Sequence, residues 1–436
     1  MSLLEILALL LGLSALFGYI NHRFFKLPHS IGLMIMALLA SGIIVSIDYV
    51  LPQYHISATI KSALVQIDFH DVVMNGMLSV LLFAGAVHVD LSDLAERKYP
   101  IALMASVGLL ISTFFIGTSV FYVLQWAGFG IPYIWALLFG ALISPTDPVA
   151  VLGILKAVSI PKGLKAKITG ESLFNDGIGV VVFVILLSIA APSSGHSADI
   201  SVLQVAIVFA QEAIGGAVLG IVGGYIAFYA MRKIDEHNIE VMITLALVAG
   251  IYAIAIRLHT SGPLAVVVAG LFIGNHGARF AMSENTRKHV FQFWELLDEI
   301  FNSILFLLIG LEILIIAAYY DYLLIALITI PIVLLGRFIG VVVPINVLKL
   351  NLKFSKGAVR FLTWGGLRGG ISVALVLSLP DNEYKPILLM LTYITVLFSI
   401  IVQGLSIAPL ARYVAKLNAP QIAEIKNDEP SGSNPE

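Results

Sequence analysis

The chain has 436 residues, of which 59% are hydrophobic and only 12% are charged. Soluble domains carry about 25% charged residues, so this composition excludes an ordinary soluble protein and indicates a membrane protein. The formal net charge of −2 gives no reason to expect a nucleic-acid partner. The absence of cysteine excludes disulfides and cysteine-ligated metals.

Apolar runs long enough to cross a bilayer, about 20 residues each, recur along the whole chain. They predict an all-α polytopic protein with thirteen transmembrane helices, the first of them retained rather than cleaved. The spans are 3–20, 30–50, 72–91, 101–126, 131–155, 166–192, 201–231, 239–257, 262–277, 289–318, 320–348, 357–379 and 386–415. Residues 1–416 therefore form one membrane unit, residues 55–70 are expected at the interface, and 417–436 are predicted to be a short disordered cytoplasmic tail.

The basic residues orient these spans. If the N-terminus lies outside, nineteen of the 25 lysines and arginines fall in cytoplasmic loops or the C-terminal tail. Three more, Lys61, Arg257 and Lys385, fall outside, and the last three lie within spans. Cytoplasmic loops of membrane proteins are enriched in Lys and Arg, so we predict an external N-terminus and a cytoplasmic C-terminus.

Two spans contain interruptions. The fifth contains SPTDP at 144–148, with a proline on each side of Thr146 and Asp147, and the twelfth contains GGLRGG at 365–370, with Arg368 among four glycines. Proline removes a backbone donor, and irregular backbone at membrane depth is tolerated where it is buried in protein or lines a cavity. Paired interruptions indicate a transporter binding site. Because the two spans are seven apart, a repeat relating them would be inverted.

The sixth span carries a polar stripe in an otherwise apolar helix. Glu171, Ser172, Asn175 and Asp176 fall within about 140° of the helix circumference. Each acid at a helix centre costs about 2.5–3.5 kcal/mol on insertion scales, so the stripe must face protein or water. We expect Asp176 to bind either a proton or a hard cation such as Na+ or Li+. Ser172, Asp147 and Thr146 are the expected neighbouring ligands of that cation.

The charges in the last spans also need partners. Arg368 stays ionised, and Glu171 or Asp147 is the acid expected to pair with it; we favour Glu171, as a structural ion pair. Arg337, inside the eleventh span, is interpreted as an interhelical contact rather than a transport residue.

Several segments together resemble the cation/proton antiporter 1 family, and within it the bacterial sodium/proton antiporters of the NhaP type. They are SPTDPVAV at 144–151, GESLFNDGIGVVVF at 170–183, GGLRGGISVAL at 365–375, AGLFIGNHG at 269–277 and WELLDEIFNSILFLLIGLEI at 294–313. The resemblance implies a homodimer in the bacterial inner membrane, with two crossing unwound helices in each protomer. A core domain would include 72–192 and 320–415, and the remaining helices would form the dimer interface.

The same resemblance implies roles for individual residues. Asp176 would be the ion-binding carboxylate, with Thr146, Asp147 and Ser172 at the ion, and Glu171 would pair with Arg368. Asn175 stands where electrogenic relatives have a second Asp, which implies electroneutral one-for-one exchange. One departure is Ala84, which stands where many members carry a Glu in the third span. Either the site has one oxygen fewer, or a nearby group such as His88 substitutes for the acid.

Other functions fit the same residues less well. A potassium/proton antiporter is the main alternative, because these ligands do not reveal the size of the cation. An ion channel is a second alternative, although one titratable carboxylate between two broken helices suits occlusion better than conduction. An intramembrane aspartyl protease using Asp147 and Asp176 is a third, but the Gly-x-Gly-Asp context of such enzymes is missing. We expect neither an enzyme nor a cofactor.

Overall fold

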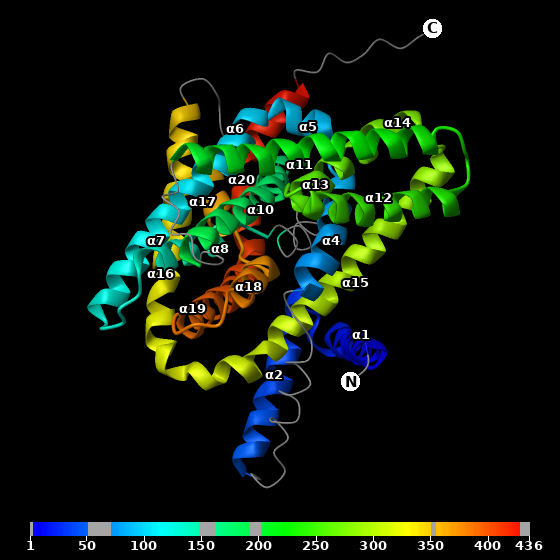
Figure 1. Cartoon of the computed structure of the whole chain (residues 1–436). Helices are drawn as coiled ribbons and strands as arrows, with labels where there is room; N and C mark the ends of the chain where they lie inside the picture. Colours follow the sequence, from blue (N-terminus) through cyan, green and yellow to red (C-terminus); the bar gives the residue numbers. More distant parts are fainter. Residues whose placement is uncertain are drawn as a thin grey trace.

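A computed structural model describes residues 3–50, 71–147, 151, 162–191, 202–349 and 355–427. Within these ranges the chain forms helices and short connections, with no β-strand. The helices pack side by side, and α1 lies at the edge of the molecule (Figure 1). The prediction of an all-α polytopic fold is confirmed.

The helices of the first half follow the predicted apolar runs. They are α1 (Leu3–Ile20), η1 (Asn21–Phe25), α2 (His29–Val50), η3 (Asp71–Met77), α4 (Leu78–Val87), α5 (Leu91–Glu96), α6 (Lys98–Leu103), η4 (Met104–Gly108), α7 (Leu109–Trp126), α8 (Tyr133–Ile143), α10 (Lys162–Ala190) and α11 (Val202–Met231). Because η3 leads directly into α4, and α6 leads through η4 into α7, each of these runs is one continuous helical segment.

The second half continues in the same way. Its helices are α12 (His237–Arg257), α13 (Gly262–Phe272), η5 (Ile273–Gly277), α14 (Ala278–Phe280), α15 (Glu284–Ile316), η6 (Ala317–Tyr322), α16 (Leu323–Leu348), α17 (Ala358–Trp364), α18 (Gly370–Leu377), α19 (Lys385–Phe398), η7 (Ser399–Gln403) and α20 (Gly404–Asn427).

Nine helices in the described part of the chain are long and apolar enough to cross a membrane. The helices Val72–Val87 and Tyr133–Ile143 are apolar but shorter. Two further predicted spans coincide with α15 and with the pair α17 and α18. Every predicted span therefore corresponds to helical structure, and thirteen membrane crossings stay a prediction. The interfacial segment predicted at 55–70 lies outside the described residues.

Both predicted interruptions are present. Helix α8 ends at Ile143, and the chain from Ser144 to Asp147 is not helical. Residues 365–369 separate α17 from α18. The sequence explains both, because prolines remove donors in the first and glycines weaken the helix in the second.

The prediction for the tail needs a correction. Helix α20 continues to Asn427, so the chain after Leu417 is helical for another ten residues. The segment from Leu417 to Asn427 contains Pro420 but otherwise includes good helix formers such as Ala, Gln, Glu and Lys. The helix runs through Pro420 to Asn427. Residues 428–436 lie outside the described part of the chain.

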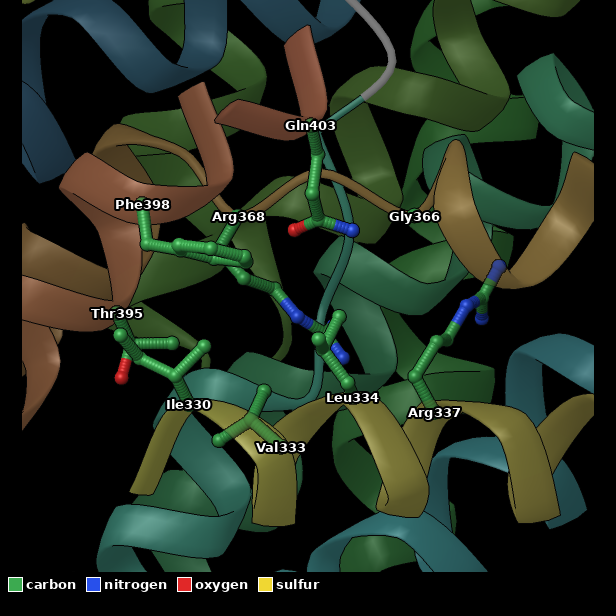
Figure 2. A pocket seen from close by; sticks show the side chains of 9 residues that line it. All are labelled: Ile330, Val333, Leu334, Arg337, Gly366, Arg368, Thr395, Phe398 and Gln403. Carbon is green, nitrogen blue, oxygen red and sulfur yellow. The ribbon is translucent and has the colours of Figure 1, made fainter. Parts of the chain in front are cut away.

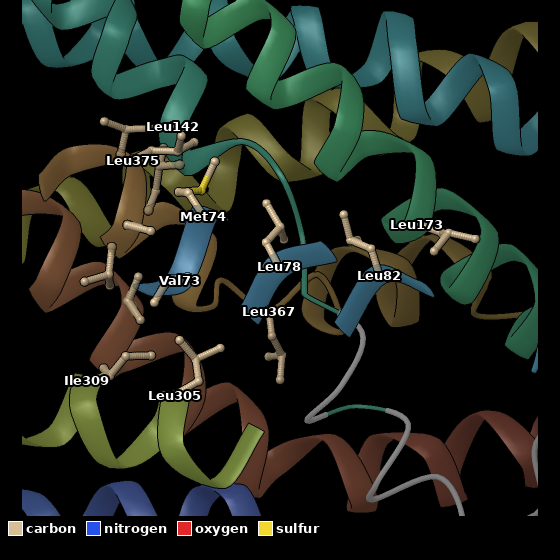
Figure 3. Packing of buried hydrophobic residues seen from close by; sticks show 14 of the residues in the cluster. Val73, Met74, Leu78, Leu82, Leu142, Leu173, Leu305, Ile309, Leu367 and Leu375 are labelled. Atoms are coloured by element: carbon tan, nitrogen blue, oxygen red, sulfur yellow. The ribbon is translucent and has the colours of Figure 1, made fainter. Parts of the chain in front are cut away.

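Buried apolar side chains surround the two interruptions. Leu367, from the second interruption, lies fully buried in the same cluster as Leu78 of α4, Leu142 of α8 and Leu305 of α15 (Figure 3). This packing excludes water from most of the region and fixes the non-helical segments against neighbouring helices.

Candidate functional site

The two interruptions meet each other. The backbone N–H of Asp147 donates to the carbonyl of Leu367 over 2.8 Å, so the two non-helical segments share a backbone hydrogen bond. The guanidinium of Arg368 donates to the carbonyl of Pro145, at 2.8 Å, and to that of Ser144. The Arg368 guanidinium therefore donates hydrogen bonds to carbonyls that follow the end of α8. These carbonyls have no helical partner and cannot reach water, so the arginine satisfies them.

Two glycines make this close approach possible. A Cβ at Gly369 would collide with the carboxylate of Asp147, and a Cβ at Gly366 would collide with the guanidinium of Arg337. Charged side chains therefore lie directly against the backbone of the second interruption. Any larger residue at these two positions would displace them, which gives a steric reason for part of the GGLRGG segment.

The polar stripe of α10 is buried as predicted. Glu171, Ser172, Asn175 and Asp176 are all 5% exposed or less. Asn175 Nδ2 donates to Thr146 Oγ1 at 2.9 Å, and the Thr146 backbone N–H donates back to Asn175 Oδ1 at 3.3 Å. The hydroxyls of Thr146 and Ser172 lie 3.0 Å apart. The stripe and the first interruption are thus connected through Thr146.

Asp176 differs from its neighbours because its carboxylate has no such partner. It is 5% exposed, and no described residue donates a hydrogen bond to it. The negative charge of Asp147 acts on it from the first interruption. The arrangement therefore brings together two carboxylates, two hydroxyls and freed backbone, which are the oxygen ligands that hard cations prefer.

The predicted ion pair between Glu171 and Arg368 is wrong. Glu171 is paired with Arg337 of α16, whose Nη2 donates to Oε2 at 3.0 Å and whose Nη1 contacts Oε1. Arg337 also donates to the carbonyl of Leu362 in α17, at 3.0 and 3.2 Å. The reason is that Arg368 is occupied by the carbonyls at the end of α8, which leaves Glu171 to the second arginine. Arg337 is the interhelical contact that the sequence indicated.

A small cavity lies between the two arginines. Its volume of about 10 Å³ is that of a single water-sized site. Figure 2 shows Arg337, Arg368 and Gln403 around it. Arg368 Nη2 is buried and has no hydrogen-bond partner among the described residues, so this cavity gives that donor room for a water molecule.

Comparison with known proteins places this geometry in a family. A family model described as "Sodium/hydrogen exchanger, transmembrane" matches residues 12–413. The chain belongs to the sodium/hydrogen exchanger family. It is therefore a multi-pass membrane transporter and not an enzyme, and the resemblance to NhaP-type antiporters is confirmed.

Relatives of this exchanger are similar over most of its length. It is 49% identical over 419 residues to the Na(+)/H(+) antiporter NhaP of Pseudomonas aeruginosa, covering 94% of this chain and 97% of that protein. It is 36% identical over 347 residues to the Na(+)/H(+) antiporter NhaH of Halobacillus dabanensis, covering 79% and 83%. The solved structure of the sodium proton antiporter MjNhaP1 from Methanocaldococcus jannaschii has the same fold. Its TM-score is 0.69 at 21% identity, and the match covers 95% of this chain and 97% of that one.

The departure in the third span of the exchanger is also visible. Ala84 is 1% exposed in α4 and follows the fully buried Phe83. Nδ1 of His88 lies 2.7 Å from the Ala84 carbonyl oxygen, and the His88 ring packs edge-on against Phe291. His88 thus contacts the backbone of Ala84 at the end of α4.

Two buried acids of the exchanger were missed by the sequence reasoning. Glu240 in α12 is fully buried, and Glu312 in α15 is 6% exposed. Glu312 is an acid within an apolar run, as Asp176 is, whereas Glu240 lies in the first turn of α12. Glu312 lies near Tyr393, whose hydroxyl donates to the carbonyl of Ile309 at 2.6 Å.

Proposed function

We propose that this chain exchanges Na+ or Li+ for H+ across the membrane, with the cation and the proton competing for Asp176. Relatives sharing up to 49% of its residues carry the name Na(+)/H(+) antiporter, which supports sodium over potassium as the cation. Alternating access of Asp176 to the two sides would turn this competition into coupled exchange.

The observation that carries the proposal is the environment of Asp176. A buried carboxylate without a hydrogen-bond donor among the described residues needs a positive charge, and either a proton or a small cation supplies it. Ser172, Thr146 and Asp147 would contribute oxygen ligands to the cation. The hydroxyls of Ser172 and Thr146 already lie within hydrogen-bond distance of each other, so they are positioned as one group.

The charges around the site support one-for-one exchange. Glu171 is already neutralised by Arg337, and Arg368 binds the carbonyls of Ser144 and Pro145. At Asp176, a single Na+ or a single proton would bring the same positive charge. Asn175 adds no charge, and its amide is engaged by Thr146. Exchange of one cation for one proton would therefore be electroneutral.

We also propose how the chain is placed and assembled. Its N-terminus would lie outside the bacterial inner membrane and its C-terminus in the cytoplasm, with thirteen crossings. The core helices within 72–192 and 320–415 would move against the remaining helices, which would form a homodimer interface. The contacts of Asp147 and Arg368 between the two interruptions support one core, because they join both of its halves.

Purified protein in liposomes with an acidic lumen and a trapped pH dye tests the proposal. Sodium or lithium chloride added outside should make the lumen alkaline, choline should not, and a clamp on the membrane potential should leave the rate unchanged. A response to potassium in place of sodium and lithium would change the substrate. A rate that depends on the clamp would contradict one-for-one exchange.

A further inference from the structure

An open cavity lies where η1 connects α1 to α2, away from the proposed ion site. Its volume is about 300 Å³, and it is lined by Asn21, His22, Lys26, Leu27 and His29. Three of these five side chains are basic and exposed, and none of the five is acidic. The cavity is therefore large enough for a polar headgroup and carries positive charge.

A hydrogen-bonded turn forms the floor of this cavity. Asn21 is 3% exposed, and its Nδ2 donates to the Leu27 carbonyl at 3.0 Å while its Oδ1 accepts from the Leu27 N–H at 3.2 Å. Its amide lies directly against Gly32 of α2, where a Cβ would collide with it. Lys26 has a φ of 53°, which reverses the chain and leaves its side chain exposed at the rim.

The side of the cavity is fixed as well. His29 Nε2 lies 2.9 Å from the hydroxyl of Ser303 in α15, and its ring packs against Gly18 of α1. The shape of the cavity is thus set by α1, α2 and α15 together, before any ligand binds.

Aromatic side chains next to the cavity locate it relative to the bilayer. Phe24 is 70% exposed and Phe25 is 54% exposed, and the guanidinium of Arg23 lies 5.9 Å from the centre of the Phe24 ring. Basic side chains at the end of an apolar helix reach toward the headgroups, while exposed phenylalanines suit the acyl chains. With α1 spanning the bilayer, the cavity at its end would open at the level of the lipid phosphates.

We propose that this cavity binds the phosphate of an anionic phospholipid headgroup, with Lys26 and His22 as the main donors. The ligand chemistry is a phosphate anion, and the exposed phenylalanines beside the cavity favour a lipid as its source over free phosphate. Because His29 is bonded to α15, and α15 packs against α18 beside the second interruption, bound lipid would stabilise the helices that surround the ion-binding core.

Thermal unfolding in a neutral detergent tests this proposal. We would compare phosphatidylglycerol, phosphatidylcholine and inorganic phosphate, each added to the same purified protein. Phosphatidylglycerol should raise the Tm of the parent by roughly 5 °C at saturation, and the other two additions should raise it little. The double variant Lys26→Gln and His22→Gln should lose most of this shift. Lys98→Gln, which removes an exposed lysine in α6 outside the cavity, should keep it.

Each other outcome contradicts the proposal. An equal shift in the double variant would show that the lipid binds elsewhere, and an equal shift with phosphatidylcholine would exclude recognition of an anionic headgroup. Stabilisation by inorganic phosphate alone would assign the cavity to a free anion. Native mass spectrometry gives a second readout, since the exposed side chain of His22 allows the single variant His22→Gln to fold, and that variant should retain fewer phosphatidylglycerol molecules than the parent.

Discussion

The pairing of Glu171 with Arg337 predicts a specific coupling energy. At 3.0 Å between Nη2 and Oε2, two unit charges attract by roughly 5 kcal/mol at an effective dielectric constant of about 20. Part of this attraction offsets the desolvation of both groups, which are 9% exposed or less. We therefore expect a double-mutant cycle of Glu171→Gln and Arg337→Gln to give a coupling of about 2–4 kcal/mol in the free energy of unfolding.

Arg368 provides the matched control for this cycle. Its guanidinium binds the carbonyls of Ser144 and Pro145 instead of Glu171, so the cycle of Glu171→Gln with Arg368→Gln should give less than about 1 kcal/mol. Denaturant titration of the purified variants in mild detergent measures both values. A larger coupling with Arg368 than with Arg337 would refute the assignment of the pair.

Three further substitutions test the site and one exposed ion pair outside it. Asn175→Ala removes both hydrogen bonds to Thr146 and should weaken the apparent sodium affinity about tenfold, whereas unchanged affinity would deny Asn175 a positioning role. Gly369→Ala should reduce exchange at least tenfold, because its methyl group displaces Asp147; Gly250→Ala, which meets open space, should not. The pKa of Asp381 lies below its usual value because Lys385 donates to it and carries a positive charge. The ionised Asp381 should thus stabilise the fold slightly at pH 7, and this effect should be lost as the pH falls below about 4. The Tm of Asp381→Asn should therefore differ from that of the parent more at pH 7 than at pH 4. A larger difference at pH 4 would contradict this pH dependence.

Much of the site was predictable from the sequence, because charged residues and irregular backbone are costly at membrane depth and occur there mainly at functional sites. Prolines around Asp147 and glycines around Arg368 identified the two interruptions, and the helical period identified the buried face of α10. The choice between Arg337 and Arg368 as the partner of Glu171 was not predictable. Both are buried arginines, and sequence spacing does not say which one the freed carbonyls of α8 will occupy.

Other features of the fold were not predictable from the sequence, again for physical reasons. The number of membrane crossings depends on where the bilayer meets each helix, and composition alone does not decide this for short helices such as α8 or charged ones such as α15. Helix α20 extends beyond Leu417 because this polar segment contains residues with high helix propensity. Its polar composition alone predicted disorder. Glu312 was not predicted because it belongs to no cluster of polar residues and stands alone between Leu311 and Ile313.

Competition at Asp176 is the central claim, and proton release on sodium binding tests it most directly. Calorimetric titration of the purified protein with sodium chloride, in two buffers of different ionisation enthalpy, gives the number of protons released per bound ion. We predict that the number of protons released per sodium equals the protonated fraction of Asp176 in the ion-free protein: about one where Asp176 is fully protonated, about half at its half-protonation pH, and fewer at higher pH. Asp176→Asn should not bind sodium. Sodium binding without proton release at any pH, or undiminished binding to Asp176→Asn, would contradict the account.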